Sequence, residues 1–531
     1  MKTFKLFFGW NPLRAVSFVL LLTFLSACAS PTQPPPQFPT FILVTQDPNS
    51  SPTPTPFQPS GQIDTAIASF TPVPIASATP EPTQTFTAPP TAIPAPINTS
   101  APPPASRDAS RTNYILYGTL DFTARTLLVD ETIRYYNNTG TALSDIVLSV
   151  QPNRYGGAFT LNSISQDNAA LTTYSLNDQR LTLNLPQALQ PNSATTLTLN
   201  FNLNIPAKRS DGVFGYDFNQ INLTDWYPFV VPYINGWVLH DPSYLGEFLV
   251  YDSSDVELNL KTDAGVVIAA SAPAEQNGEW TRYRLYGART FTLSASDEFL
   301  VAESVVGSVV IRSYYFAGYQ TAGEAILSTA ADAVSTFESN YAPYPYQTLA
   351  VVQADINDGQ EYDGLVFLAT DFYAQYSGGS RNNLTTIGVH EIAHQWWFGL
   401  VGSDQALEPW LDEALALYSE RIFYENNYPA NISWWWQYRV DYFKPSGFVD
   451  MPVYSAGSQR EYVNAVYLNG AYFIDELRER MGYGNFAKFL KAYAARYSRG
   501  HATSADFFAV ARETVNVDIS DLIARYFSQS Y

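Results

Sequence analysis

Apolar and polar residues alternate through much of the first half of this chain, and this pattern constrains its fold most strongly. The alternation begins near Tyr114, continues to about Val306, and is clearest over residues 197–203. A period of two predicts β-strands with one buried face and one face in water. We therefore expect an all-β domain over residues 112–306.

The period becomes helical after about Gly307. Apolar residues then recur at intervals of three or four, as in Ile326, Ala330, Val334 and Phe337. Later runs over residues 470–481, 486–497 and 504–515 show the same helical spacing. We expect a second, α+β and mostly helical domain over residues 307–531. Two domains also suit a chain of 531 residues, which is too long for one ordinary core.

The start of the chain has the layout of a secretory signal. Basic residues precede the apolar residues 15–25, a run too short to span a bilayer comfortably. Residues 25–28 resemble the bacterial lipoprotein box, in which the cysteine is lipidated and becomes the new N-terminus. We expect residues 1–28 to be a lipoprotein signal peptide. Cys28 would anchor the protein to a bacterial cell membrane, outside the cytoplasm.

Cys28 is also the only cysteine, so an internal disulfide and a cysteine-ligated metal site are both excluded. Residues 29–111 are dominated by Pro, Thr, Ser and Ala. This composition cannot bury enough apolar surface to fold, so we expect a disordered stalk. The net charge is −20 and no long basic run occurs, which argues against nucleic acid as a partner.

Residues 390–394 read HEIAH, an HExxH motif. On a helix, residues four apart share a face, so His390 and His394 can point at one ion. Zinc accepts imidazole nitrogen and leaves a position for water at catalytic sites. Glu391 is placed to act on that water as general base and proton shuttle. The alternative is a solvated helix that happens to carry these residues.

Glu413 follows His394 after 18 intervening residues, within the run Trp-Leu-Asp-Glu. This spacing resembles the HExxH-(x18)-E pattern of the aminopeptidase N family, which includes the leukotriene hydrolases. The segment 394–399 similarly resembles the family's HQWFG, and residues 410–413 resemble its WLNE. The resemblance implies a thermolysin-like catalytic domain, one zinc ion per chain, and Glu413 as the third ligand.

Residues 358–365 resemble the family's GAMEN segment, an edge strand whose glutamate binds the α-amino group of the substrate. That glutamate is Glu361 by position, whereas Gln360 replaces the usual methionine and Asp358 the usual glycine. The alternative is an acidic loop on the surface. The family also has an additional amine contact from the β domain, for which Gln151 is only a weak candidate.

Residues 467–471 resemble the family's Y-x-K-G-a, with Asn469 in place of the usual lysine. The resemblance implies that the hydroxyl of Tyr467 stabilises the oxyanion of the tetrahedral intermediate. Tyr462 is a nearby competitor for this role, and an ordinary packing aromatic is the other alternative.

These features predict a membrane-tethered zinc aminopeptidase that acts on peptides with free N-termini. Two rivals stay open: an endopeptidase with the same machinery, and a lipoprotein that binds peptides or glycans on a disarmed peptidase fold. We also expect the large C-terminal helical domain of many relatives to be missing.

Overall fold

The computed structural model describes residues 107–210 and 212–531. The predicted signal peptide, Cys28 and nearly all of the predicted stalk lie outside these residues. Within the described part of the chain, no helix is both long and apolar enough to cross a membrane.

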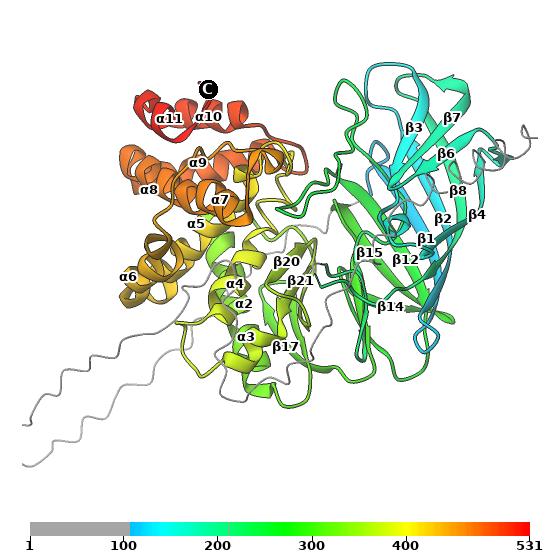
Figure 1. The fold of residues 1–531 in the computed structure, drawn as a ribbon, viewed down its shortest axis with the longest axis horizontal. Helices are drawn as coiled ribbons and strands as arrows, with labels where there is room; N and C mark the ends of the chain where they lie inside the picture. Colours follow the sequence, from blue (N-terminus) through cyan, green and yellow to red (C-terminus); the bar gives the residue numbers. More distant parts are fainter. Residues whose placement is uncertain (1–106, 211) are drawn as a thin grey trace, which may run out of the picture. The chain divides into compact units, whose positions relative to one another are not determined.

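The first half of the described chain is built from β-strands, as the alternation predicts (Figure 1). Its largest sheet has eight strands, in the spatial order β14 (Ala274–Asn277), β15 (Trp280–Ala288), β12 (Ser254–Lys261), β1 (Thr112–Asp121), β2 (Thr126–Tyr136), β8 (Ala194–Asn204), β4 (Phe159–Gln166) and β5 (Ala169–Ala170). Neighbouring strands are antiparallel except for the parallel pair β1 and β12. In β8 the apolar residues at alternate positions are buried, whereas most of the threonines and asparagines between them stay partly or fully exposed.

Two four-stranded sheets complete this β-rich region. One has the order β13 (Val267–Ala270), β16 (Leu293–Ser296), β10 (Gln220–Leu223) and β9 (Gly215–Asp217). The other has the order β11 (Phe229–Val230), β3 (Leu143–Ser149), β7 (Arg180–Leu189) and β6 (Tyr174–Asn177). A short 3-10 helix, η1 (Gln151–Arg154), follows β3.

A five-stranded mixed sheet begins the second region. Its order is β17 (Leu300–Val306), β18 (Val309–Tyr315), β19 (Thr348–Ala354), β21 (Leu365–Ala369) and β20 (Gly359–Tyr362). β20 pairs only with β21 and is therefore an edge strand. The domain boundary expected after Val306 falls within the β17–β18 hairpin, so the second sheet starts one strand earlier than the sequence suggests.

The rest of the chain is mostly helical, which agrees with the predicted fold class. The longer helices are α2 (Gln320–Asn340), α4 (Asn383–Ala393), α5 (Trp410–Asn427), α8 (Gly470–Met481), α9 (Tyr483–Arg496) and α10 (Ser504–Thr514). Shorter helices are α3 (Thr370–Gln375), η2 (Pro429–Asn431), α6 (Ile432–Trp435), the π-helix η3 (Trp436–Val440), η4 (Asp441–Phe443), η5 (Val453–Ser455), α7 (Gln459–Tyr462), the π-helix η6 (Val463–Asn469) and α11 (Ser520–Tyr526).

Helix α4 is buried along its whole length between α2 and α5. The side chain of Asn382 caps its N-terminus by accepting a hydrogen bond from the backbone N–H of Thr385 at 2.9 Å. Gly388 permits the close approach of α2, because a Cβ at this position would lie 2.4 Å from Cδ1 of Ile326. A helix held this firmly is a rigid support for the side chains it carries.

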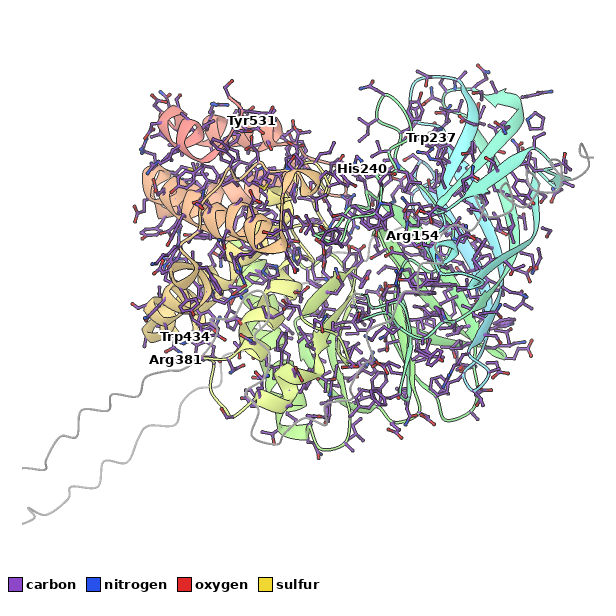
Figure 2. The ribbon with its side chains drawn as sticks, viewed as in Figure 1. Arg154, Trp237, His240, Arg381, Trp434 and Tyr531 are labelled. Atoms are coloured by element: carbon purple, nitrogen blue, oxygen red, sulfur yellow. The ribbon has the colours of Figure 1, made fainter. Side chains whose placement is uncertain are left out.

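Hydrogen bonds join the β-rich region to the turn after β20. Asp363 Oδ2 accepts from the backbone N–H groups of Arg289, at 2.8 Å, and Thr290, at 2.7 Å. A second connection is the hydrogen bond between His240 Nε2 and Asp404 Oδ2 at 2.9 Å; His240 is labelled in Figure 2. Both connections lie close in sequence to residues of the candidate site.

Candidate active site

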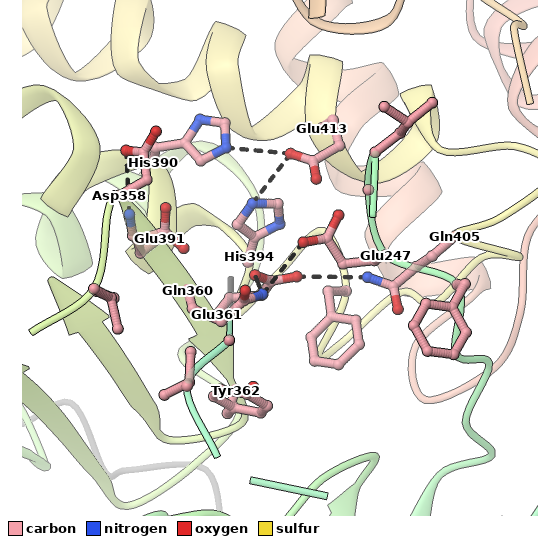
Figure 3. Close-up of a pocket in the computed structure, with 18 of the residues that line it drawn as sticks. Glu247, Asp358, Gln360, Glu361, Tyr362, His390, Glu391, His394, Gln405 and Glu413 are labelled. Atoms are coloured by element: carbon pink, nitrogen blue, oxygen red, sulfur yellow. Dashed lines mark hydrogen bonds and ion pairs between the residues drawn. The ribbon is translucent and has the colours of Figure 1, made fainter. Parts of the chain in front are cut away.

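Helices α4 and α5 bring the three predicted metal ligands together (Figure 3). His390 lies in α4, His394 is the C-cap residue one turn further on, and Glu413 lies in the first turn of α5. Nε2 of His390 is 3.3 Å from Oε2 of Glu413, and Nε2 of His394 is 3.6 Å from the same oxygen. One donor atom from each residue therefore fits within a 4.8 Å group, as a single metal ion requires.

A second carboxylate fixes the orientation of each imidazole. Nδ1 of His390 is 3.2 Å from Oε1 of Glu420, and Nδ1 of His394 is hydrogen-bonded to Oδ1 of Asp412. When Nδ1 donates to a carboxylate, the lone pair of Nε2 is left for a metal. Sequence reasoning missed both residues, although Asp412 adjoins Glu413 and Glu420 lies two turns further along α5.

Glu420 is itself held in the ionised form by a buried arginine. Arg439 donates from Nε at 2.9 Å and from Nη2 at 2.6 Å, and Trp435 donates from Nε1 at 2.8 Å. Burial acts to raise the pKa of Glu420, but the charge of Arg439 outweighs it and holds that pKa below its usual value. Glu420 is therefore a permanent acceptor for His390.

The pKa values of the two imidazoles shift in opposite directions. Burial lowers the pKa of His390 to about 4, so this ring is neutral near pH 7. Burial also acts to lower the pKa of His394, but the charges of Asp412 and Glu361 overcome it and raise that pKa well above its usual value. The surrounding carboxylates thus attract positive charge to this point. Two imidazole nitrogens and one carboxylate oxygen are the donors zinc prefers, so the residues present fit the ion.

Glu391 lies beside these ligands, at a cavity of about 480 Å³. It is 5% exposed, which contradicts the alternative of a solvated helix. Burial raises the pKa of Glu391 well above its usual value, which suits a group that must take up and release a proton. Gly359 on β20 leaves room for the side chain of Glu391, because a Cβ at position 359 would lie 2.2 Å from Oε1 of Glu391.

Glu361 enters the same cavity from the edge strand β20. It is 6% exposed, so the alternative of an acidic surface loop is wrong. Burial raises its pKa to about 8. A buried carboxyl with a raised pKa is suited to pairing with a cation that enters the cavity, because the positive charge stabilises its ionised form.

The structure distinguishes the two candidate tyrosines. Tyr467 lines the cavity, and its ring stacks on His390 with a centroid distance of 6.2 Å and an interplanar angle of 13°. Its hydroxyl is hydrogen-bonded to Glu413. The hydroxyl of Tyr462 instead packs against Gly246 and is sealed from solvent. Of the two, Tyr467 is the one that faces the predicted metal ligands.

The β-rich region contributes a carboxylate that the sequence did not reveal. Glu247, in the segment between β11 and β12, lines the cavity and accepts a hydrogen bond from Nε2 of Gln360 at 3.3 Å. Gln151, the weak sequence candidate, instead bonds to Ser149 and Gln179, and it is not among the residues that line the cavity. No motif or periodicity marks Glu247, so only the fold could identify it.

Acidic side chains outnumber basic ones in the lining of the cavity. Six carboxylates line it, whereas among the described lining residues Arg439 is the only arginine or lysine. The carboxylates are Asp225, Glu247, Asp358, Glu361, Glu391 and Glu413. Because Arg439 is already paired with Glu420, the cavity has a net affinity for positively charged groups.

Comparison with known proteins agrees with this geometry. The chain is similar to aminopeptidase M1-C of Oryza sativa subsp. japonica, with 26% identity over 236 residues, and to aminopeptidase M1 of Arabidopsis thaliana, with 25% identity over 247 residues. These alignments cover 41% and 43% of this chain, but only 27% and 28% of the two plant proteins. The chain thus matches about a quarter of the length of these relatives.

Solved structures match over a larger share of the chain. An M1 zinc metallopeptidase from Deinococcus radiodurans, bound to a Tyr-Ser-Ala substrate, superposes with a TM-score of 0.58 at 17% identity and covers 80% of this chain and 95% of its own. A two-domain M1 zinc metallopeptidase bound to L-arginine gives the same TM-score at 15% identity. At this identity the likeness shows a shared fold.

The sequence model of one protein family also matches this chain. The family is described as the peptidase family M1 domain, and the match covers residues 326–526. Residues 326–526 of this chain thus match a peptidase family M1 domain, and a β-rich region precedes them.

Proposed function

We propose that this protein is a zinc-dependent aminopeptidase that removes N-terminal residues from peptides outside the cytoplasm. The observation that carries the proposal is the position of Glu361. Its buried carboxylate shares one cavity with the HExxH glutamate Glu391 and with the ligand set. A group that binds a free amine beside a hydrolytic site selects the terminal peptide bond.

His390, His394 and Glu413 would hold the zinc ion, with Glu420 and Asp412 as the acceptors that orient the two imidazoles. When bound, zinc supplies a Lewis acid that polarises the scissile carbonyl and lowers the pKa of a bound water from about 15.7 to about 7.

Two residues of the chain would then move or stabilise charge. Glu391 takes a proton from the attacking water and passes it to the leaving amine, a role supported by its burial and its raised pKa. Tyr467 donates a hydrogen bond to the oxygen on which negative charge develops, a role supported by its place beside His390 and Glu413.

Glu361 and Glu247 would bind the α-ammonium group of the substrate. Charge-assisted hydrogen bonds are strong in a sheltered site, and both carboxylates line the cavity. An N-acetylated peptide would place a neutral amide beside these two carboxyl groups. The amine subsite would lose its ion pairs, so we expect blocked peptides to be poor substrates.

The test uses the full chain and pairs of aminoacyl fluorogenic amides, one with a free amine and one N-acetylated, with and without a zinc chelator. We expect cleavage that the chelator abolishes and that is confined to the free amines. Cleavage of the acetylated substrates at comparable rates would establish an endopeptidase instead. Zinc binding without cleavage of any substrate would support a binding protein on a disarmed fold.

We further propose that lipidated Cys28 tethers the enzyme to a bacterial cell membrane. The support is the sequence alone, since this residue lies outside the described part of the chain. Substitution Cys28→Ser should release the protein into the soluble extracytoplasmic fraction and abolish its labelling by a fatty-acid probe. Retention of Cys28→Ser in the membrane fraction would contradict the proposal.

A further inference from the structure

Two glutamine amides contact the two oxygens of Glu361. Nε2 of Gln360 donates to Oε2 at 2.8 Å, and Nε2 of Gln405 donates to Oε1 at 3.5 Å (Figure 3). An amide is a neutral donor, so it fixes the orientation of the carboxylate without cancelling its charge. A lysine or arginine in either place would hold Glu361 equally well but would compete with a cationic ligand.

The amide nitrogen of Gln405 also donates to Oδ2 of Asp412 at 2.8 Å. The other oxygen of Asp412 is hydrogen-bonded to Nδ1 of His394. A continuous chain of hydrogen bonds therefore runs from Glu361 through Gln405 and Asp412 to His394. All four side chains are buried, with at most 6% of any of them exposed. An NH₂ group has two hydrogens, and here they serve two carboxylates.

The backbone around Gln405 is firmly anchored. The carboxylate of Asp404 accepts from the N–H groups of Ala406, at 3.1 Å, and Leu407, at 3.0 Å, and it pairs with His240 of the β-rich region. The carbonyl of Ala406 accepts from the N–H of Val453 at 2.9 Å. The loop thus presents the side chain of Gln405 from a fixed position.

We propose that Gln405 is a positioning residue that couples the amine subsite to the metal-ligand histidine. It sets the position of the Glu361 carboxylate relative to His394, and with it the distance from the substrate's α-amine to the bond that is cut. This inference rests on the proposed aminopeptidase function. Correct placement of reacting groups is a large part of enzymatic rate enhancement, so an error of about 1 Å can cost roughly 100-fold.

The two glutamines offer a matched pair of variants. Gln405→Met and Gln360→Met both keep the length of the side chain and remove the amide. Gln360 is hydrogen-bonded to Glu361 and Glu247 but not to Asp412. Of the two glutamines, only Gln405 is therefore connected to a metal ligand through hydrogen bonds. Leu407→Ala, in the same loop and 45% exposed, controls for general disturbance of the loop.

Two quantities are measured for each variant. The first is zinc affinity, determined by competition with a chelator. The second is the amine preference, which is the ratio of kcat/KM for a free-amine leucine amide to kcat/KM for its N-acetylated form. For Gln405→Met we expect zinc affinity to fall by several-fold, less than the roughly 10- to 100-fold effect of losing a direct partner of a ligand, because Gln405 acts through Asp412. The amine preference should fall by a similar factor. Gln360→Met should lose amine preference alone, and Leu407→Ala should change neither quantity.

A purely structural role of Gln405 would lower the melting temperature and leave both quantities within twofold of the unmodified protein, which would overturn the inference. Equal losses of zinc affinity in the two Met variants would also overturn it, because the coupling would then not run through Asp412. If the unmodified protein cleaves no substrate, the proposed function fails, but the zinc measurement still decides whether Gln405 supports His394.

Discussion

At the scale of single residues, the ligands could be predicted from spacing because one helix turn and a fixed interval define them. The residues that hydrogen-bond to these ligands or hold their partners in place could not be predicted from the sequence. Asp412, Glu420 and Gln405 contact the site through tertiary packing of α4, α5 and the loop before α5, and no local pattern marks such contacts. Glu247 is further removed still, since it comes from the β-rich region.

Glu391→Gln tests the assignment of the general base. The amide cannot accept the proton of water, so kcat should fall by about 10²–10⁴-fold, the usual contribution of a general base. The group His390, His394 and Glu413 does not include Glu391, so zinc held by these three residues should still bind at one ion per chain. Activity is measured with a leucine amide, and zinc content by elemental analysis. Full activity with zinc bound would eliminate Glu391 as the base.

Tyr467→Phe tests the oxyanion donor. The variant keeps the ring that stacks on His390 and removes only the hydroxyl. Loss of one such donor typically lowers kcat by about 10²–10³-fold, and KM should change little because the interaction strengthens in the transition state. Tyr462→Phe is the matched control: its hydroxyl is buried and has no hydrogen-bond partner among the described residues, so its removal should leave kcat within about twofold. A larger effect at Tyr462 than at Tyr467 would reverse the assignment.

At the scale of elements, the sequence predicted strands and helices well where one face is buried. The helix expected over residues 470–481 is α8, and it ends at Gly482, whose φ of +79° suits a glycine. The expected domain boundary was less accurate. Strand β17 directly follows the other strands in the sequence. Only its pairing with β18, and that of β18 with the distant β19, places it in the second sheet. Local periodicity carries no information about such a partner.

Strand β2 carries an exception to its own alternation. Glu131 occupies an inward position of this strand and is fully buried. Neither of its oxygens is hydrogen-bonded to a residue that the structure describes. Burial raises its pKa well above the usual value. Below about pH 4.5 the group is neutral in both the folded and unfolded chain. As the pH rises, only the unfolded chain releases the proton, so Glu131 destabilises the fold increasingly until the pH reaches its folded-state pKa.

Glu131→Met removes this dependence while nearly keeping the side-chain volume. The stability gained by the variant over the unmodified protein should therefore grow from pH 4.5 to pH 7.5, by at most about 1.4 kcal/mol per pH unit. The measurement is the free energy of unfolding in denaturant at four pH values. Asp130→Asn, on the exposed face of the same strand, serves as control. A gain that is constant with pH would show that Glu131 titrates normally.

At the scale of the whole molecule, acidic residues outnumber basic ones both in the chain as a whole and in the lining of the cavity. The chain carries a net charge of −20, and six carboxylates line the cavity against one paired arginine. A low-dielectric cavity with walls of one sign concentrates its field, and this field should attract positively charged substrates from solution and repel anionic ones. The excess of acidic residues was readable from composition, but its concentration at the cavity was not.

The charge of the N-terminal residue should therefore set both the rate and its response to salt. Arginyl, citrullinyl and glutamyl amides differ in side-chain charge, from positive through neutral to negative, and each also carries the α-ammonium group. Salt shortens the range of the field from about 30 Å at 0.01 M to about 3 Å at 1 M. Between 0.01 M and 0.5 M salt we expect kcat/KM to fall most for the arginyl amide, by several-fold, less for the citrullinyl amide, and least for the glutamyl amide, which should also be the poorest substrate at low salt. Citrulline matches arginine in shape, so the difference between these two isolates charge. Equal salt dependence for all three amides would mean that the carboxylates of the cavity act only at contact distance, on the amine and the water, and not as a field.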